Sequence, residues 1–331
     1  MENSVNFIAS RIYHFHYIMP LIIELNKWKK RPSIFLSDNE LILKRMGEIE
    51  GLSKKYNFDI HKIEQINNFP SNITFMIEGD SGDKIKYKTK KAVLTLETIF
   101  TENRFYPVYI NKVDYVFINS KKFFDSWAEK DLYGGHFKNQ YLGSPKYDIK
   151  LSSVSRLLNK YQIRENNILV IYPNRRDQDL VNIDGICKTI LSCGFQPVIK
   201  IRDKYPYSNS EYKIIDDASI FPHPTMELIK ASKIVINFTS SAIEEIVELR
   251  KPCINIHIKP FMQMPYLYNY SYCRKMPVNY SDKDLKKNIE DLSSNDYSKE
   301  FDKCFSECLT NSLGCCERIL ALVNEEGTGK K

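Results

Sequence analysis

The sequence lacks the segments that would insert it in a membrane or export it from the cell. No apolar run approaches the roughly 18 residues that a membrane span needs. The N-terminus MENSVNFIAS has neither the basic region nor the long apolar core of a signal peptide. We therefore expect a cytoplasmic protein, and the sequence leaves open a peripheral association with the inner face of the membrane.

A disulfide framework and a zinc motif are also missing. All eight cysteines lie from Cys187 onward, no CxxC pair occurs, and no group of His and Cys has zinc-site spacing. Cys315 and Cys316 are adjacent, which does not suit a disulfide framework. We predict cysteines that serve as small buried apolar side chains in a reducing compartment.

Charge of one sign is only mildly in excess. The net charge is +7, and the dense basic runs are residues 27–31 and 84–91. Solvated faces explain such runs, so nucleic acid is not the expected partner. The same excess suits a protein that handles anionic nucleotides or works beside an acidic membrane.

The chain of 331 residues is longer than one compact core usually is, and its 43% hydrophobic and 27% charged residues are typical of globular proteins. Short apolar segments alternate with helical ones, which indicates parallel α/β architecture. The expected strands are Val5–Ala9, Ser33–Leu36, Ile73–Ile77, Ala92–Leu96, Tyr115–Ile118, Gln140–Leu142, Ile168–Tyr172, Gln196–Ile201, Ser219–Phe221, Ile234–Asn237 and Cys253–His257.

A Gly/Pro turn at Gly143–Asp148 marks the expected domain boundary. We predict two Rossmann-like parallel-sheet domains, 1–145 and 146–305, which face each other across a cleft and bind a ligand where the strand C-termini meet. Phe261–Tyr280 is expected to be a loop over this cleft. Lys299–Asn324 reads as one amphipathic helix, so that residues 306–331 comprise a C-terminal helix and a disordered tail.

The stretch from Ile234 to Ile256, IVINFTSSAIEEIVELRKPCINI, is the most informative part of the chain. An apolar strand ends at three small hydroxyl residues, a helix with two carboxylates begins at once, and a second strand follows. Short side chains at a helix start leave backbone N–H groups open to a phosphate. An N-cap in an ordinary β/α repeat is the alternative. The candidate nucleotide or phosphate ligands here are Thr239, Ser240, Ser241, Glu244 and Glu245.

Further candidates follow other predicted strands, at the sheet edge where such folds bind ligands. His14 and His16, in the loop after the first strand, suit a general base, although packing would also explain them. Asp80 follows the third strand, where it is either a ligand or a turn residue. Glu97 ends a buried strand, where a carboxylate is costly unless it is catalytic or paired, for example with Arg104.

Three cations complete the predicted site. Arg175 and Arg176 follow the first strand of the second half, where a guanidinium fork suits phosphate oxygens; adjacent side chains need not point the same way, so one of the two is expected to bind. Lys200 lies one β/α unit before the hydroxyl cluster. Cations, hydroxyls and helix dipole together describe a diphosphate site that needs no metal ion.

With these residues in place, the chain resembles the GT-B superfamily of nucleotide-sugar enzymes over nearly its whole length. Residues 112–120 and 143–148 look like the CDP-glycerol glycerophosphotransferase branch, and Ser240-Ser241, Glu245 and Lys251-Pro252 resemble its DYSS-to-GKP region. That branch carries H-G and K-x-H-P motifs where this chain reads Leu96-Glu97-Thr98 and Lys200-Ile201-Arg202.

The chain is also similar to the UDP-N-acetylglucosamine 2-epimerases. The matching segments are Ser10-Arg11 with Pro20-Leu21-Ile22, Gly79-Asp80-Ser81, Leu96-Glu97, Glu102-Asn103-Arg104, Asn174 to Asp177, and Thr239 to Glu245. In this chain Asn174 replaces a family histidine, and two serines replace a double glycine.

The resemblance implies a metal-independent transferase that moves a sugar or polyol phosphate from a nucleotide-activated donor to a surface-glycan or lipid-linked acceptor, with no further cofactor. His16 or His14, or else Glu97, would deprotonate the acceptor, while the cations and the helix start stabilise the departing nucleotide phosphate. One alternative is a hydrolysing or non-hydrolysing UDP-N-acetylglucosamine 2-epimerase in which Asp80, Glu97 and Glu102 move protons. Another is a GT-B relic that binds a nucleotide or a partner without turnover. A homodimer is left open.

Overall fold

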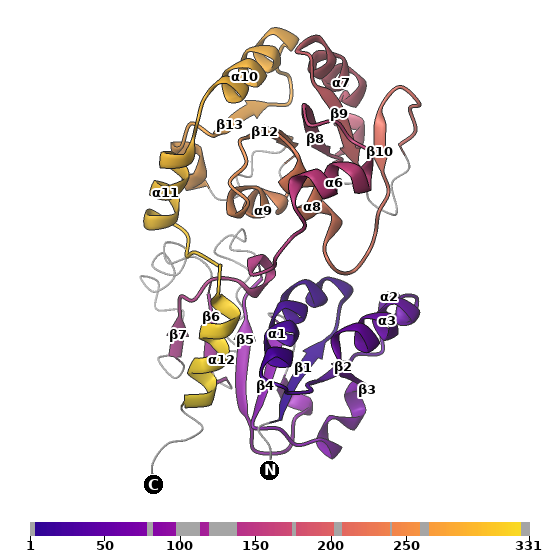
Figure 1. The fold of residues 1–331 in the computed structure, drawn as a ribbon, viewed down its shortest axis with the longest axis vertical. Helices are drawn as coiled ribbons and strands as arrows, with labels where there is room; N and C mark the ends of the chain where they lie inside the picture. Colours follow the sequence, from indigo (N-terminus) through magenta and orange to yellow (C-terminus); the bar gives the residue numbers. More distant parts are fainter. Residues whose placement is uncertain are drawn as a thin grey trace. The chain divides into compact units, whose positions relative to one another are not determined.

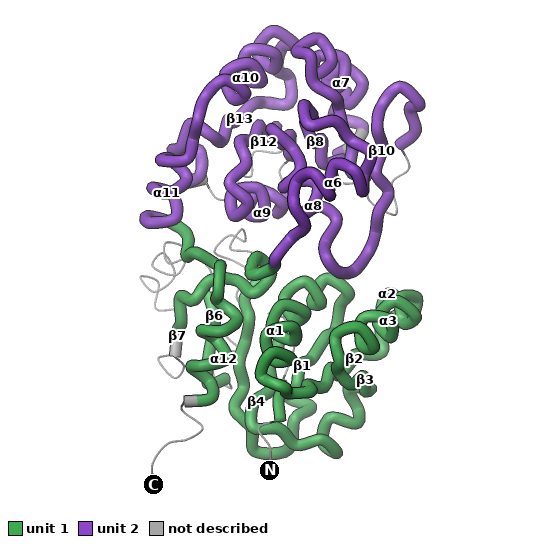
Figure 2. The backbone as a smooth tube through the Cα atoms, in the orientation of Figure 1, with its two compact units in different colours: residues 1–149, 308–331 green, residues 150–307 purple. Residues whose placement is uncertain are grey.

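A computed structural model describes residues 4–77, 82–96, 113–118, 138–173, 177–201, 207–238, 240–258 and 265–325. The chain forms two compact units, coloured green and purple in Figure 2. Unit 1 comprises Met1–Ile149 and Cys308–Lys331, and unit 2 comprises Lys150–Glu307. The predicted domains were divided at 145/146 and 305/306, whereas the chain leaves unit 1 after Ile149 and returns to it at Cys308.

Unit 1 contains a seven-stranded parallel sheet of order β3-β2-β1-β4-β5-β6-β7. Its strands are β1 (Val5–Ala9), β2 (Ser33–Leu36), β3 (Asp59–Lys62), β4 (Ile73–Ile77), β5 (Lys90–Leu94), β6 (Tyr115–Phe117) and β7 (Lys138–Gln140). In the register, Phe7 of β1 pairs with Ile34 on one side and with Phe75 on the other. All residues of β1 and β4 are buried, because neighbouring layers cover both faces of a central parallel strand.

The helical segments of unit 1 are η1 (Ile12–His14), α1 (Phe15–Lys27), α2 (Glu40–Leu43), α3 (Met46–Tyr56), η2 (Ile63–Asn68), η3 (Gly82–Lys84), η4 (Pro145–Tyr147) and α12 (Cys315–Glu325). Helix α1 buries most of its length and contacts both η4 and α12. The C-terminal helix α12 is therefore part of the core of unit 1, although it follows unit 2 in the chain (Figure 1).

Unit 2 contains a six-stranded parallel sheet of order β10-β9-β8-β11-β12-β13. Its strands are β8 (Asn167–Ile171), β9 (Gln196–Lys200), β10 (Lys213–Ile215), β11 (Ile234–Asn237), β12 (Cys253–His257) and β13 (Cys273–Pro277). The helical segments are α6 (Val154–Tyr161), η5 (Gln178–Leu180), α7 (Ile183–Ser192), α8 (Pro224–Ala231), α9 (Ala242–Glu248), η6 (Pro265–Asn269), α10 (Asp282–Ser294) and α11 (Ser298–Glu307).

Side-chain caps fix where several of these helices begin. Ser153 accepts a hydrogen bond from the backbone N–H of Arg156 at the start of α6, and Asn182 accepts one from Gly185 at the start of α7. Ser281 does the same for α10. Such caps satisfy N–H groups that have no partner within the helix, so polar residues at these positions set the helix boundaries.

Three elements predicted from the sequence differ in the structure. Ser219–Phe221 is not a strand: Ile220 and Phe221 are buried, but the segment does not pair with the sheet. Phe261–Tyr280 is not only a loop, since it includes η6 and the edge strand β13. Lys299–Asn324 is two helices, α11 and α12, and Gly314 just before α12 has a φ of +72°.

Two observations concern the predictions made from the cysteines and from the lack of long apolar runs. All eight cysteines are free, and all except Cys193 are buried. No helix in the described parts of the chain is long and apolar enough to cross a membrane.

Candidate functional site

In each sheet, successive strands along the chain are added to one side of the first strand and then, from one point on, to its other side. In unit 2 the chain builds β8, β9 and β10 outward to one side and then returns to place β11 on the other side of β8. In unit 1 the corresponding neighbours are β1 and β4. Loops that follow the two central strands diverge at such a switch point and leave a crevice for ligands at the carboxyl ends of the strands.

The predicted phosphate ligands of unit 2 follow its two switch-point strands. Ser240 and Ser241 come just after β11, while Arg175 and Arg176 come after β8 in the sequence. Arg175, Arg176 and Thr239 lie outside the described residues. The topology therefore brings the ends of the two strands that precede these candidates next to each other.

The turn before α9 presents both serines at partly exposed positions. Ser240 Oγ accepts a hydrogen bond from the backbone N–H of Ala242 at 3.4 Å, whereas Ser241, at the N-cap position, makes no side-chain cap. Helix α9 has 7 residues. Because a two-turn helix has a weaker dipole than a long one, cations have to supply much of the charge that a phosphate would need.

The two glutamates of α9 are buried rather than displayed. Glu244 is 0% exposed and Glu245 is 4% exposed. Glu245 Oε2 lies 3.6 Å from Nδ1 of His223, which immediately precedes α8. His223 was not among the candidate site residues predicted from the sequence. The His223-Pro224 pair at the start of a helix was the sequence feature that could have indicated it.

Lys200 is buried at the carboxyl end of β9, the neighbour of β8 away from β11. Its ammonium donates a hydrogen bond to the backbone carbonyl of Ile201 at 2.5 Å. Lys200 therefore lies at the predicted edge of the sheet, one strand away from the switch point.

A buried polar chain links the turn before α9 to η6. Asn237 Nδ2 donates to the backbone carbonyl of Ser240 at 3.2 Å and to Asn255 Oδ1 at 2.8 Å. Asn255 Nδ2 in turn donates to the hydroxyl of Tyr268, which lies 2.9 Å from Nε2 of His257. Asn255 Nδ2 also lies 3.2 Å from His257 Nε2, so Asn255, His257 and Tyr268 form one partly buried polar cluster.

The surroundings of these hydrogen-bonded residues keep His257 neutral. Burial, with a smaller contribution from the positive charge of Lys275, lowers the pKa of His257 below its ordinary value. Burial also raises the pKa of Tyr268, which therefore stays protonated.

A polar residue inside an apolar strand is unusual. Asn237 and Asn255 carried this signal in the sequence, while nothing in the sequence indicated Tyr268.

In unit 1, His14 and His16 follow β1 at its switch point. His14 is buried, and its Nδ1 accepts a hydrogen bond from the backbone N–H of Ser10 at 3.3 Å. His16 is partly exposed in the first turn of α1. Asp80 and Glu97 lie outside the described residues, as does Glu102.

Lys146 adds a buried cation near the start of α1 that was not predicted. Its side chain is 3% exposed, and its ammonium lies 5.6 Å from the ring centre of Tyr17 and 5.5 Å from that of Tyr147. Aromatic faces stabilise a cation at such distances. In the sequence, Lys146 was only a turn residue of Gly143–Asp148.

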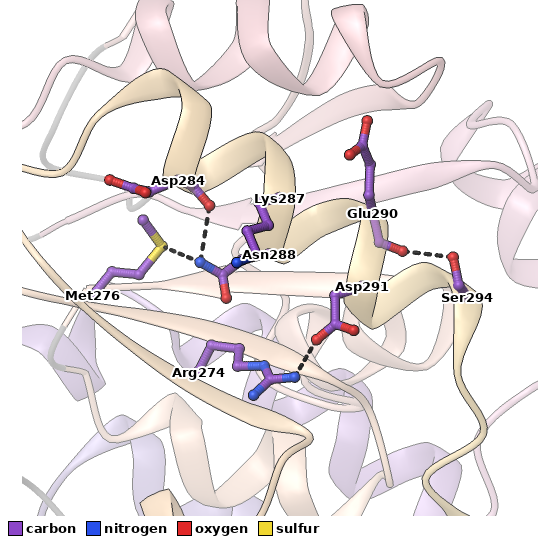
Figure 3. Close-up of a pocket in the computed structure, with 8 residues that line it drawn as sticks. All are labelled: Arg274, Met276, Asp284, Lys287, Asn288, Glu290, Asp291 and Ser294. Atoms are coloured by element: carbon purple, nitrogen blue, oxygen red, sulfur yellow. Dashed lines mark hydrogen bonds and ion pairs between the residues drawn. The ribbon is translucent and has the colours of Figure 1, made fainter.

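A groove on the flank of unit 2 lies apart from these residues, between the edge strand β13 and α10 (Figure 3). Arg274 forms an ion pair with Asp291 there, and Asn288 Nδ2 donates to Met276 Sδ at 3.5 Å. The groove is lined by Arg274, Met276, Asp284, Lys287, Asn288, Glu290, Asp291 and Ser294. None of the predicted site residues is among them.

Two Rossmann-like units, each with an all-parallel sheet and its own switch point, define the class of protein: the chain has the GT-B fold. No protein-family model and no curated protein matches the sequence.

Solved structures match the fold over nearly the whole chain. A putative UDP-N-acetylglucosamine 2-epimerase from Listeria monocytogenes has a TM-score of 0.65 at 12% identity, covering 100% of this chain and 98% of that one. The UDP-GlcNAc 2-epimerase of Methanocaldococcus jannaschii in complex with UDP-GlcNAc and UDP gives 0.62 at 14%, covering 97% and 99%. The wall teichoic acid polymerase TagF gives 0.62 at 12%, covering 98% and 89%. At these identities the similarity establishes the fold.

Proposed function

We propose that this chain is a metal-independent transferase that moves a sugar or polyol phosphate from a nucleotide-activated donor to a surface-glycan acceptor. One observation supports the proposal: β11, which precedes the serine turn, is the sheet neighbour of β8, which precedes Arg175 and Arg176 in the sequence. Ligands of doubly wound sheets bind at that point. The fold agrees with this class of donor, because a neighbour of the same fold was solved with UDP-GlcNAc and UDP.

Unit 2 would hold the nucleotide. Backbone N–H groups and hydroxyls at Ser240 and Ser241 would bind phosphate oxygens, and Arg175 or Arg176 would neutralise their charge. Lys200 would contribute from the neighbouring strand. These fixed donors stabilise negative charge on the departing nucleotide, and this is why we assign no metal and no further cofactor to the reaction.

Unit 1 would supply the general base that deprotonates the acceptor hydroxyl. His16 is the better of the two histidine candidates, because it is partly exposed, whereas His14 is buried with Nδ1 engaged by Ser10. A general base must reach the proton that it removes. Glu97 is the third candidate for this role.

The glycan acceptor rests on the similarity to TagF, a wall teichoic acid polymerase. A lipid-linked form of such an acceptor would bring the protein to the inner face of the membrane. Neither a homodimer nor membrane association is needed for the chemistry.

Nucleotide binding is the first test. Thermal-shift screening with CDP, CMP, UDP and GDP should find at least one nucleotide that stabilises the native state, because a ligand that binds only the folded protein must raise its stability. Replacing Ser240 and Ser241 together by leucine should abolish that shift and leave the fold intact. The adjacent exposed pair Ser293 and Ser294 on α10, changed in the same way, is the matched control.

The outcomes of this test are distinct. If the serine-turn variant still binds nucleotide as the wild type does, the turn before α9 is an ordinary β/α connection. If no nucleotide stabilises the wild type, the leading alternative is a GT-B relic that binds a partner without turnover.

A UDP-N-acetylglucosamine 2-epimerase, hydrolysing or non-hydrolysing, is the second candidate, since two of the described neighbours are epimerases by name. In that reaction Asp80, Glu97 and Glu102 would move protons. Incubation with UDP-N-acetylglucosamine and no acceptor separates the two functions. Sugar that is epimerised or released without an acceptor would refute the transferase.

A further inference from the structure

Two distant parts of the chain bring metal-ligating side chains together in unit 1. Asp148 lies just after η4, and Cys315 and Cys316 are the first two residues of α12. One carboxylate oxygen and the two sulfur atoms all lie within 4.8 Å of one another. Among the described residues, no other group of this kind is so close.

We propose that Asp148, Cys315 and Cys316 form a zinc site that fastens the C-terminal helix α12 to the end of the first half of unit 1. The donor set supports this choice of ion, since thiolates and a carboxylate are ligands that Zn²⁺ prefers, whereas Mg²⁺ and Ca²⁺ prefer oxygen alone. Three protein ligands leave one tetrahedral position for water. This site is separate from the proposed nucleotide site and does not depend on it.

The spacing of the three atoms is close to what zinc requires. An equilateral triangle with sides of 4.8 Å has its centre about 2.8 Å from each corner, against about 2.3 Å for a Zn–S bond and about 2.0–2.2 Å for Zn–O. Because 4.8 Å is the upper bound, each sulfur has to move by at most about 0.5 Å and the oxygen by at most about 0.8 Å to reach the ion.

The backbone around the ligands is held in place on both sides. Asp148 Oδ1 and Oδ2 accept hydrogen bonds from the N–H groups of Gly314 and Cys316, each at 2.8 Å. Arg318 donates to the carbonyls of Leu142 and Asn311. Support of this kind orients metal ligands and is part of their affinity.

A close backbone contact adds to this support. Gly143 has a φ of +93°, and a Cβ atom at this position would meet Ser312 Cα at 2.7 Å. The segments on either side of the proposed site are therefore packed against each other with no side chain between them.

Metal binding at these three atoms would be an exchange of protons for the ion. The Cys315 and Cys316 sulfur atoms and an Asp148 carboxylate oxygen lie within 4.8 Å of one another. Zinc would replace the two thiol protons: Zn²⁺ and two thiols give a neutral pair of Zn–thiolate bonds and two protons released to solvent, while the carboxylate oxygen coordinates without loss of a proton. No change of oxidation state is involved.

Metal titration of the intact chain tests the site. After treatment with a chelator, the protein is titrated with Cd²⁺, a spectroscopic substitute for Zn²⁺, and the thiolate-to-metal absorption is followed. Zinc content after dialysis is measured by mass spectrometry. We expect one ion per chain and, for Cys315→Ser and Cys316→Ser separately, an affinity at least about tenfold lower.

Cys187→Ser is the matched control, because Cys187 is equally buried but lies on α7 of unit 2. It should leave the titration unchanged. The cadmium NMR shift of the wild type distinguishes two thiolates plus oxygen from other donor sets, and so tests the proposal even if the serine variants do not fold. Absence of a thiolate band in the wild type, or a band that both serine variants retain, would overturn it.

Discussion

Removing the hydroxyl of Tyr268 tests whether the buried polar chain of unit 2 supports the proposed nucleotide site. Through Asn255 and Asn237, this hydroxyl connects to the carbonyl of Ser240, which belongs to the serine turn. Tyr268→Phe keeps the ring and removes only the oxygen. The substitution therefore perturbs the turn without creating a large cavity.

The expected loss of stability follows from the bonds that disappear. Tyr268 makes two hydrogen bonds within the chain, one to Asn255 and one to His257. Asn255 Nδ2 keeps a contact with His257 Nε2 at 3.2 Å, so it is not left without a partner. At about 1 kcal/mol net for each bond, the free energy of unfolding should fall by about 1–2 kcal/mol.

Nucleotide affinity is the informative measurement. Without the Tyr268 hydroxyl the side chain of Asn255 is held less firmly, and so is Asn237, which donates both to Asn255 and to the carbonyl of Ser240. We expect the dissociation constant of the best nucleotide from the screen to rise about tenfold, equivalent to about 1.4 kcal/mol. Tyr270→Phe is the control. The Tyr270 hydroxyl donates to Glu307 at 2.7 Å, away from the serine turn.

Isothermal titration calorimetry gives the affinities of the three proteins, and urea denaturation gives their stabilities. Tyr270→Phe should lose stability and keep its affinity. If Tyr268→Phe binds nucleotide as tightly as the wild type, the polar chain does not support the site. If both variants lose affinity equally, the effect is general destabilisation.

Three further predictions concern stability and are measured by chemical denaturation. The pKa of His257 is lower in the native state than in the unfolded state, so the unfolded state binds more protons below about pH 6.5. The free energy of unfolding of the wild type should therefore decrease as the pH is lowered below about 6.5. His257→Gln should lose this part of the pH dependence. Burial and the nearby Lys233 and Lys230 lower the pKa of Lys251 from 10.5 to about 8, which corresponds to about 3 kcal/mol of destabilisation at pH 7. Lys251→Met removes this buried charge but also loses a hydrogen bond to the carbonyl of Ser232, so the net gain in stability should be about 1–2 kcal/mol at pH 7. The gain should shrink between pH 8 and 10.5, because the native lysine is then neutral. A destabilised variant would contradict the argument. Gly143→Ala should cost about 2 kcal/mol or more because of its positive φ and the contact with Ser312, whereas Gly51→Ala in the open interior of α3 should gain about 0.5–1 kcal/mol; equal effects would show that the close contact is not needed.

The sequence was most informative about the buried centre of each sheet. Val5–Ala9, Ser33–Leu36, Ile73–Ile77, Ile234–Asn237 and Cys253–His257 are strands with the predicted bounds. Five other predicted strands are present with shifted or shortened ends. Apolar, β-branched runs are typical of central parallel strands, because helices or loops cover both faces of the strand.

The strands that the sequence did not reveal are all at sheet edges. They are β3, β10 and β13, with the sequences DIHK, KII and CRKMP. An edge strand is partly exposed and tolerates charged residues, so it has no continuous apolar run. Their assignment needed a neighbouring strand to pair with.

For the candidate site, the sequence alone identified residues at or just after the carboxyl ends of strands: His14, His16, Lys200, Ser240 and Ser241. Such positions can be read locally, since a strand and the residues after it are adjacent in the chain. Which strands are neighbours was decided by the tertiary structure, and with it the switch points. The structure also showed that Glu244 and Glu245 are buried.

Other contacts depended entirely on folding. Tyr268 meets Asn255, and Asp148 meets Cys316, across sequence separations of 13 and 168 residues. The linear spacing of Cys315 and Cys316 gave no metal motif because the third ligand comes from the other end of unit 1. Local patterns thus determined the class of fold and the strand ends at which the candidate residues lie, while packing between distant segments determined which of the described side chains lie together.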